Sequence, residues 1–134
     1  MIVVDSCVWI DHFATRSTRA SEWLDQHFEP ANTLLGDVIA LEVLRGFRLD
    51  KDYRAAKAIF DVLPYDTMLG KARAYRAASR YRDLRKRGLT VRKRGDITIA
   101  SYCIDTNIPL LTSDRDFAPF AKHLGLALIV PIEV

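Results

Sequence analysis

The chain has 134 residues, of which 49% are hydrophobic and 28% charged, and this composition predicts one globular domain over residues 1–134. It excludes a disordered chain and a disulfide-stabilised mini-protein, because there are only two cysteines and no low-complexity stretch. The net charge is +3, and no apolar run approaches the roughly 20 residues that span a bilayer. Because there is no signal peptide and Cys7 and Cys103 are interpreted as buried thiols, we expect a cytosolic protein without membrane contact.

Short apolar segments alternate with segments of helical spacing along the chain. Strands are predicted at residues 1–4, 33–35, 109–112 and 127–130. Helices are predicted, in chain order, over residues 6–13, 18–28, 37–47, 50–63, 66–86, from 96 onward, and 114–124. This alternation indicates βαβ units and therefore an α/β fold with a parallel sheet.

Positive charge is concentrated in one segment. Eleven of the 20 Lys and Arg residues, but only one of the 17 acids, lie between Lys71 and Arg94. Phosphate groups would relieve the repulsion between these cations, so the segment predicts a nucleic-acid-binding surface; a solvated helix face is the alternative. The candidate binding residues are Arg73, Arg76, Arg80, Arg92, Lys93 and Arg94. Tyr75, Tyr81 and Tyr102 are candidates for base stacking, with Tyr81 also a candidate core residue.

Four acids occupy positions from which they can meet at one edge of the sheet. Asp5 and Asp114 directly follow predicted strands, Asp96 heads a helix, and Glu42 lies in the helix after the second strand. Ligands of open parallel sheets bind beyond the carboxyl ends of the strands. Converging carboxylates need a compensating cation, and hard oxygen ligands suit Mg²⁺ or Mn²⁺. Such an ion would activate water and stabilise the charge on a scissile phosphate.

Each of these acids also has a purely structural interpretation. Asp5, Asp96 and Asp114 are suitable helix N-caps, and Glu42 can pair with Arg45 on a solvated helix face. Glu42, however, borders the apolar stripe of its helix, where a carboxylate needs a partner. Spacing alone leaves both interpretations open.

Four motifs are similar to those of VapC-type PIN-domain ribonuclease toxins. They are MIVVDSCVWID, ALEVLRGF, GDITIAS and LLTSDRDF, which occur in the family's order and span essentially the whole chain. The resemblance implies a three-layer α/β/α fold with a central parallel sheet. It also implies endonuclease activity on RNA that depends on Mg²⁺ or Mn²⁺.

The resemblance implies roles for individual residues and for partners. The catalytic and metal-binding acids would be Asp5, Glu42, Asp96 and Asp114. Additional support for the site would come from Ser6, Thr112 and Asp116. The family further implies a VapB-type antitoxin as partner, RNA as substrate and a homodimer.

Three other interpretations are weighed against this one. A PIN-like module can bind RNA or protein without catalysis, but all four acids are retained here. A receiver-like signalling domain needs a Lys after a late strand, and none follows PLLT or ALIVP. A DNA-directed nuclease of the same fold remains open.

Overall fold

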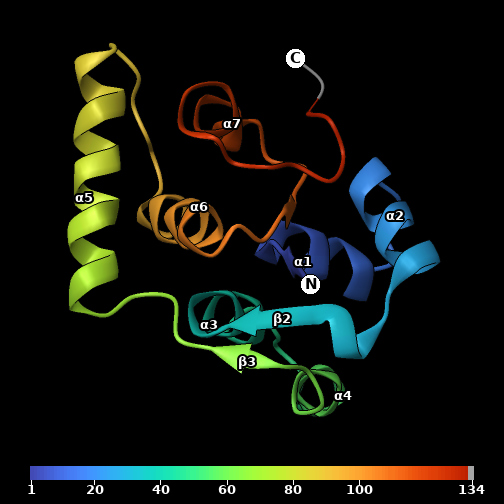
Figure 1. The fold of residues 1–134 in the computed structure, drawn as a ribbon. Helices are drawn as coiled ribbons and strands as arrows, with labels where there is room; N and C mark the ends of the chain where they lie inside the picture. Colours follow the sequence, from blue (N-terminus) through green and yellow to red (C-terminus); the bar gives the residue numbers. More distant parts are fainter. Residues whose placement is uncertain (133–134) are drawn as a thin grey trace.

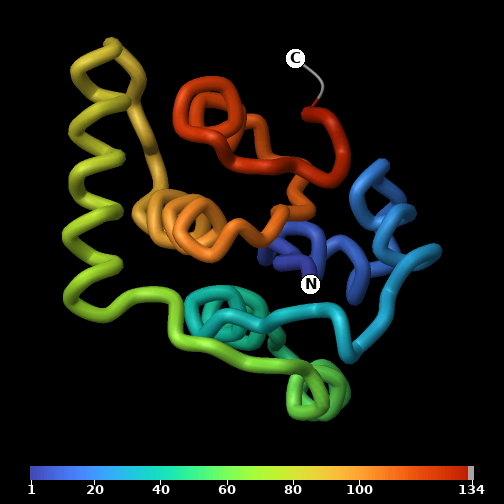
Figure 2. Tube along the Cα trace, in the orientation of Figure 1, coloured from blue at the N-terminus to red at the C-terminus, as the bar shows by residue number. Residues whose placement is uncertain are grey.

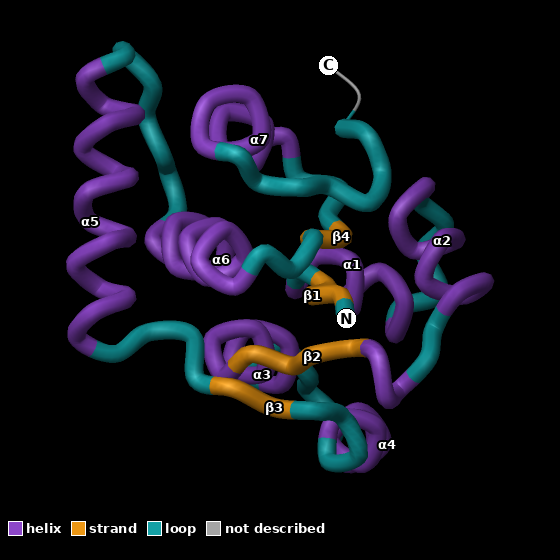
Figure 3. Tube along the Cα trace, in the orientation of Figure 1, coloured by secondary structure: helices purple, strands orange, loops and turns teal. Residues whose placement is uncertain are grey.

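Four short parallel strands form the central sheet of the protein. The structure is a computed structural model and describes residues 1–132. The strand order is β3-β2-β1-β4, and Figure 3 shows the strands side by side in this order. Their bounds are β1 (Ile2–Val4), β2 (Thr33–Gly36), β3 (Tyr65–Asp66) and β4 (Leu110–Leu111). Every pairing is parallel, as the alternation of strands and helices predicted.

Seven α-helices and two 3₁₀ turns, within residues 1–132, surround this sheet. The helices are α1 (Ser6–Phe13), α2 (Arg19–His27), α3 (Asp37–Leu44), α4 (Asp50–Phe60), α5 (Lys71–Lys86), α6 (Arg94–Thr106) and α7 (Ala118–Leu124). The 3₁₀ turns are η1 (Pro30–Asn32) and η2 (Arg115–Phe117). Figures 1 and 2 show α5 at one side of the molecule, where it packs against α6 and lies away from the strands.

Both faces of the sheet are covered. Val3 and Val4 point to opposite faces because side chains alternate along a strand, and both are completely buried. Their neighbours Leu110 and Leu111 on β4 are also completely buried. Burial on both sides is typical of parallel sheets and gives the predicted three-layer α/β/α arrangement. Within the described residues, no helix has the length and apolar character needed to cross a membrane.

Two predicted elements are shorter in the structure than the sequence predicted. The long helix does not start at residue 66, because Tyr65 and Asp66 pair with Leu35 and Gly36 as strand β3, and α5 begins only after Gly70. Gly70 has a φ of 95°, in the left-handed region that glycine adopts readily, and the chain turns there between the strand and the helix. The predicted strand at 127–130 is reduced to a single parallel bridge between Leu128 and Leu110. Within the described residues, this bridge consists of two hydrogen bonds, from the Leu110 N–H to the carbonyl of residue 127 and from the N–H of residue 129 to the Leu110 carbonyl. The pairing does not extend into a longer ladder.

The sheet register determines where the functional side chains can lie. Val4 on β1 is aligned with Leu111 on β4. The backbone N–H of Asp5 donates to the carbonyl of Leu111 at 2.9 Å, which brings Asp5 and Thr112 to the same carboxyl-terminal edge. Residues more than 100 positions apart therefore meet where the two central strands end.

Candidate metal centre

Asp5 is the first residue after β1 and the N-cap of α1, and only 3% of it is exposed. Its Oδ1 accepts the backbone N–H of Ser6 at 2.8 Å. Its Oδ2 accepts the Thr112 hydroxyl at 2.8 Å and the Cys7 thiol at 3.1 Å. Burial raises the pKa of Asp5 above its usual value, although these hydrogen bonds oppose that rise. The carboxylate is thus held in one orientation and only partly compensated.

Glu42 reaches Asp5 from α3 through a shared serine. The Ser6 hydroxyl donates to Glu42 Oε2 at 2.9 Å, while Glu42 Oε1 is buried without a hydrogen-bond partner in the described chain. A Cβ atom on Gly95 would lie 2.7 Å from Glu42 Oε1. Glycine at position 95 therefore leaves the space that this carboxylate occupies beside the start of α6.

Asp96 is a second buried carboxyl group of the site whose pKa is raised. It lies in the first turn of α6, is 6% exposed, and its Oδ2 is buried without a hydrogen-bond partner among residues 1–132. Burial, followed by the negative charges of Asp5 and Asp114, raises the pKa of Asp96 to about 7. A group in this environment is stabilised by a proton or by a cation, and the protein supplies neither to Oδ2.

Asp114 follows β4 and caps the 3₁₀ turn η2. Its backbone N–H donates to the Thr112 hydroxyl at 3.1 Å, and its Oδ1 accepts the backbone N–H of Asp116 at 2.9 Å. Its Oδ2 accepts the ammonium of Lys93 at 2.9 Å. Burial by itself would raise the pKa of Asp114, but the Asp116 N–H and the Lys93 charge hold it below its usual value.

The predicted acids and their predicted supporting residues all lie at this edge of the sheet. Asp96, Asp114 and Asp116 each place one carboxylate oxygen within 4.8 Å of the others. Ser6 connects Glu42 to Asp5, and Thr112 connects Asp5 to Asp114. The atoms that could bind a metal here are carboxylate oxygens, which are hard ligands. Two of them at this site, Glu42 Oε1 and Asp96 Oδ2, are buried without a hydrogen-bond partner in the described structure. Such a site fits Mg²⁺ or Mn²⁺ better than a soft metal.

Two of the predicted nucleic-acid-binding arginines are engaged in contacts between α5 and α6. Arg80 Nη1 lies 2.7 Å from Asp105 Oδ1 and 2.6 Å from Ser101 Oγ. Arg76 Nε lies 3.0 Å from the same oxygen of Asp105, whose side chain is 8% exposed. These hydrogen bonds connect α5 to α6, so both guanidinium groups have a structural partner.

Arg73 and Tyr102 form a separate contact near strand β3. The Arg73 guanidinium lies 4.7 Å from the centre of the Tyr102 ring and donates to the Thr67 carbonyl at 2.7 Å. Tyr102 is 2% exposed and donates its hydroxyl to Asp66 at 2.7 Å. The prediction that Tyr102 stacks on a base was therefore wrong, because its ring is buried. Tyr75, in contrast, is 67% exposed.

Two features of the site were missed by the sequence analysis. Cys7 was interpreted as a buried thiol without a function, but it is only partly buried and donates to Asp5, while Cys103 is buried as expected. Lys93 was assigned to nucleic-acid binding only, and its ion pair with Asp114 was not predicted. The basic run before Gly95 was the available signal, since it directly precedes the turn that carries Asp96.

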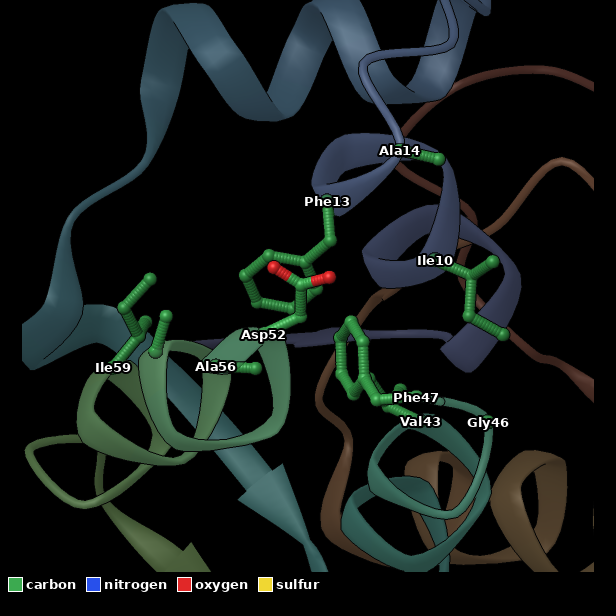
Figure 4. A pocket seen from close by; sticks show the side chains of 10 residues that line it. Ile10, Phe13, Ala14, Val43, Gly46, Phe47, Asp52, Ala56 and Ile59 are labelled. Carbon is green, nitrogen blue, oxygen red and sulfur yellow. The ribbon is translucent and has the colours of Figure 1, made fainter. Parts of the chain in front are cut away.

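A hollow of about 500 Å³ lies between α1, α3 and α4, away from the acidic cluster, and Figure 4 shows its lining. The lining residues are mostly apolar: Ile10, Phe13, Ala14, Val43, Gly46, Phe47, Asp52, Ala55, Ala56 and Ile59. Asp52 is the one carboxylate among them, so this hollow lacks a ligand set for a metal ion. It shares no residue with the acidic cluster.

Comparisons with known proteins agree with this geometry. The sequence matches the PIN domain over residues 2–123. It is 32% identical over 131 residues to VapC ribonuclease Mb1587 of Mycobacterium bovis and to ribonuclease VapC11 of Mycobacterium tuberculosis. Each alignment covers 94% of this chain and 96% of the relative. The chain therefore belongs to the PIN-domain family, among its VapC members.

Solved structures share the fold at much lower sequence identity. FitAcB from Neisseria gonorrhoeae superimposes with a TM-score of 0.76 at 15% identity, covering 98% of both chains. VapBC2 from Rickettsia felis, bound to a DNA fragment from its promoter, gives a TM-score of 0.71 at 17% identity. That alignment covers 96% of this chain and 97% of the other. These likenesses confirm the predicted fold class.

Proposed function

We propose that this protein is a metal-dependent endoribonuclease and the toxin component of a type II toxin–antitoxin module. The observation that carries the proposal is the meeting of Asp5, Glu42, Asp96 and Asp114 at one edge of the sheet, with two buried carboxylate oxygens that lack a partner in the described chain. The ribonuclease activity named for the VapC relatives supports RNA as the substrate.

The four acids would hold one or two Mg²⁺ or Mn²⁺ ions. When bound, the ion would activate water and stabilise the charge that develops on the scissile phosphate. The protein's own contribution is orientation. Thr112 and the Ser6 N–H fix the Asp5 carboxylate, and the Ser6 hydroxyl fixes Glu42. Because these hydrogen bonds exist before substrate arrives, little reorganisation is needed during the reaction.

The basic segment next to the acids would bind the RNA backbone. Lys93 contacts Asp114, so Arg92 and Arg94 on either side of Lys93 border the acidic edge. Arg92 and Arg94 are exposed and can approach phosphate groups. We also propose backbone contacts for Arg73, Arg76 and Arg80, in addition to the structural contacts they make. Specificity would then come from RNA shape and unpaired bases.

The proposed protein partner is a VapB-type antitoxin. Its support is that the structurally similar proteins include VapBC complexes and a toxin–antitoxin complex from Klebsiella pneumoniae. One of those complexes carries promoter DNA, and we assign any DNA-binding role to the partner rather than to this chain. A homodimer and a cytosolic location stay predictions, the latter supported by two free cysteines.

The direct test is cleavage of total cellular RNA by the purified chain, with Mg²⁺ or with chelator. Asp5→Ala is the test variant, and Asp61→Ala, at an exposed acid paired only with Lys57 in the described structure, is the matched control. Discrete metal-dependent fragments from the wild type and the control, but not from Asp5→Ala, support the proposal.

Two other outcomes would favour the competing functions. Cleavage of DNA but not of any RNA identifies a DNA-directed nuclease. No cleavage of either nucleic acid, together with no calorimetric metal binding, identifies a non-catalytic binding module. Equal cleavage by Asp5→Ala and wild type, with the fold intact by circular dichroism, removes Asp5 from the catalytic set.

A further inference from the structure

A lysine of the chain already lies against the acidic cluster. Lys93 is the N-cap residue of α6, and its Nζ lies 2.9 Å from Asp114 Oδ2. The side chain of Lys93 is 63% exposed, whereas that of Asp114 is 20% exposed. The ammonium therefore approaches the cluster from the solvent side on a flexible four-carbon stem.

This ammonium interacts with the whole cluster and not with Asp114 alone. Besides the ion pair with Asp114, it is attracted by the charges of Asp96 and Asp116. These are the same three carboxylates that have oxygens within 4.8 Å of one another. Both oxygens of Asp114 have a partner, since Oδ1 accepts the Asp116 N–H and Oδ2 accepts Lys93. A cation that binds Asp114 Oδ2 therefore competes with the lysine.

We propose that Lys93 is an internal competitor for the divalent cation, which neutralises the acidic cluster until a metal ion displaces it from Asp114. This inference rests on the proposed function, because it requires the acids to bind a metal. Two like charges cannot share one carboxylate at close range without mutual repulsion. Lys93 consequently lowers the metal affinity and stabilises the cluster when no ion is bound.

The arginines of α5 show why a lysine suits this role. Arg80 donates to Asp105 and to the hydroxyl and carbonyl oxygens of Ser101, and Arg76 pairs with Asp105, so the two arginines connect two helices. Lys93 makes a single hydrogen bond, to the carboxylate of Asp114, and its backbone lies at the N-cap of α6. Its release breaks no helix–helix contact, so the exchange of lysine for metal requires only a side-chain rotation.

The experiment is a calorimetric titration of chelator-treated protein with Mn²⁺ at low salt, without RNA. The test variant is Lys93→Met, and the control is Lys122→Met, which removes the same charge from an exposed site on α7. We expect Lys93→Met to bind Mn²⁺ about two- to fivefold more tightly than the wild type, because an exposed ion pair is weak. Lys122→Met should match the wild type, and Lys93→Arg should retain the competition.

A thermal melt of the same proteins gives a second readout. Without metal, Lys93→Met should melt at a lower temperature than Lys122→Met, and Mn²⁺ should raise its melting temperature by more. Equal or weaker Mn²⁺ binding by Lys93→Met would overturn the inference and leave the metal site intact. Absence of Mn²⁺ binding in both Lys93→Met and the wild type would instead overturn the metal site itself, and the competition with it.

Discussion

The acidic edge of the sheet and the basic helix α5 both concentrate one sign of charge, but they balance it in different ways. On α5, Arg76 and Arg80 meet Asp105 at 3.0 and 2.7 Å. At the acidic edge, Asp96, Asp114 and Asp116 each place one carboxylate oxygen within 4.8 Å of the others, and the cation that contacts them in the described structure is a single solvent-exposed lysine. The two regions also differ in the sequence, because the basic residues are clustered between Lys71 and Arg94 whereas the acids of the site are scattered from Asp5 to Asp116.

Charge that lacks a counter-charge within the described chain, rather than a high density of charge, therefore identifies the candidate functional site. Arg76 and Arg80 contribute to the packing of α5 on α6, because the side chain of Asp105 is largely buried there and needs cations. The acidic edge retains a negative excess in a partly desolvated position, which costs stability unless a ligand compensates it.

Removing an acid from the site should have the largest effect. Asp96→Asn should lower RNA cleavage by about 1000-fold, because metal-assisted charge stabilisation contributes several kcal/mol to the barrier. Single-turnover cleavage with saturating Mg²⁺ measures this loss, with Asp61→Asn as the matched control. Cleavage by Asp96→Asn within about threefold of wild type would contradict the assignment.

The pH dependence of stability should expose the same carboxyl group. The pKa of Asp96 is raised from 3.8 to about 7, so the folded state binds more protons than the unfolded state between these values. In chelator, stability should therefore fall as pH rises from 5 to 8, by a few kcal/mol at most, with a contribution of the same sign from Asp5. Urea denaturation at each pH measures the slope.

Asp96→Asn should flatten this slope, because the amide cannot ionise. Above pH 5, Asp105 and Asp114 remain ionised since their pKa values are lowered, so they contribute little change in this range. A slope that is identical in wild type and Asp96→Asn would show that Asp96 does not titrate near neutral pH.

Removing the charge of Asp105, which lies between α5 and α6, should lower the stability of the fold and leave RNA cleavage unaffected. Asp105→Asn should lower the free energy of unfolding by about 1–2 kcal/mol, because it removes the charge that Arg76 and Arg80 share, and those arginines remain partly solvated. The exposed pair of Asp83 and Arg87 provides a control, and Asp83→Asn should cost less than about 0.5 kcal/mol. Equal losses in the two variants would contradict the structural role of Asp105.

Substitutions of the arginines should have the smallest effect. Replacing Arg92 and Arg94 together by Ala should weaken RNA binding about three- to tenfold. It should also reduce the slope of log affinity against log salt concentration by the equivalent of about one to two phosphate contacts. Arg76→Ala should change RNA affinity less, because its guanidinium is paired with Asp105. Fluorescence anisotropy at several salt concentrations, with an inactive site variant, measures both. A larger loss from Arg76→Ala would move the main RNA surface to α5.

The α/β class, the position of Asp5 and Asp114 directly after strands, and the four motifs typical of the family could all be predicted from the sequence. These features are local, because apolar periodicity and motif order can be read within a few residues. Strand β3 was missed for the opposite reason, since two residues, Tyr65 and Asp66, have no periodicity and become a strand only by pairing with β2.

The pKa values of the site and the contacts between its side chains depend on the tertiary structure. The pKa of Asp96 depends on burial and on Asp5 and Asp114, which are 91 and 18 positions away in the chain. The space for Glu42 depends on Gly95 in another helix, and the pairing of Lys93 with Asp114 joins two loops. Desolvation and ion pairing arise when distant segments pack together, so a local pattern such as the basic run before Gly95 can indicate a candidate residue but does not specify its partner.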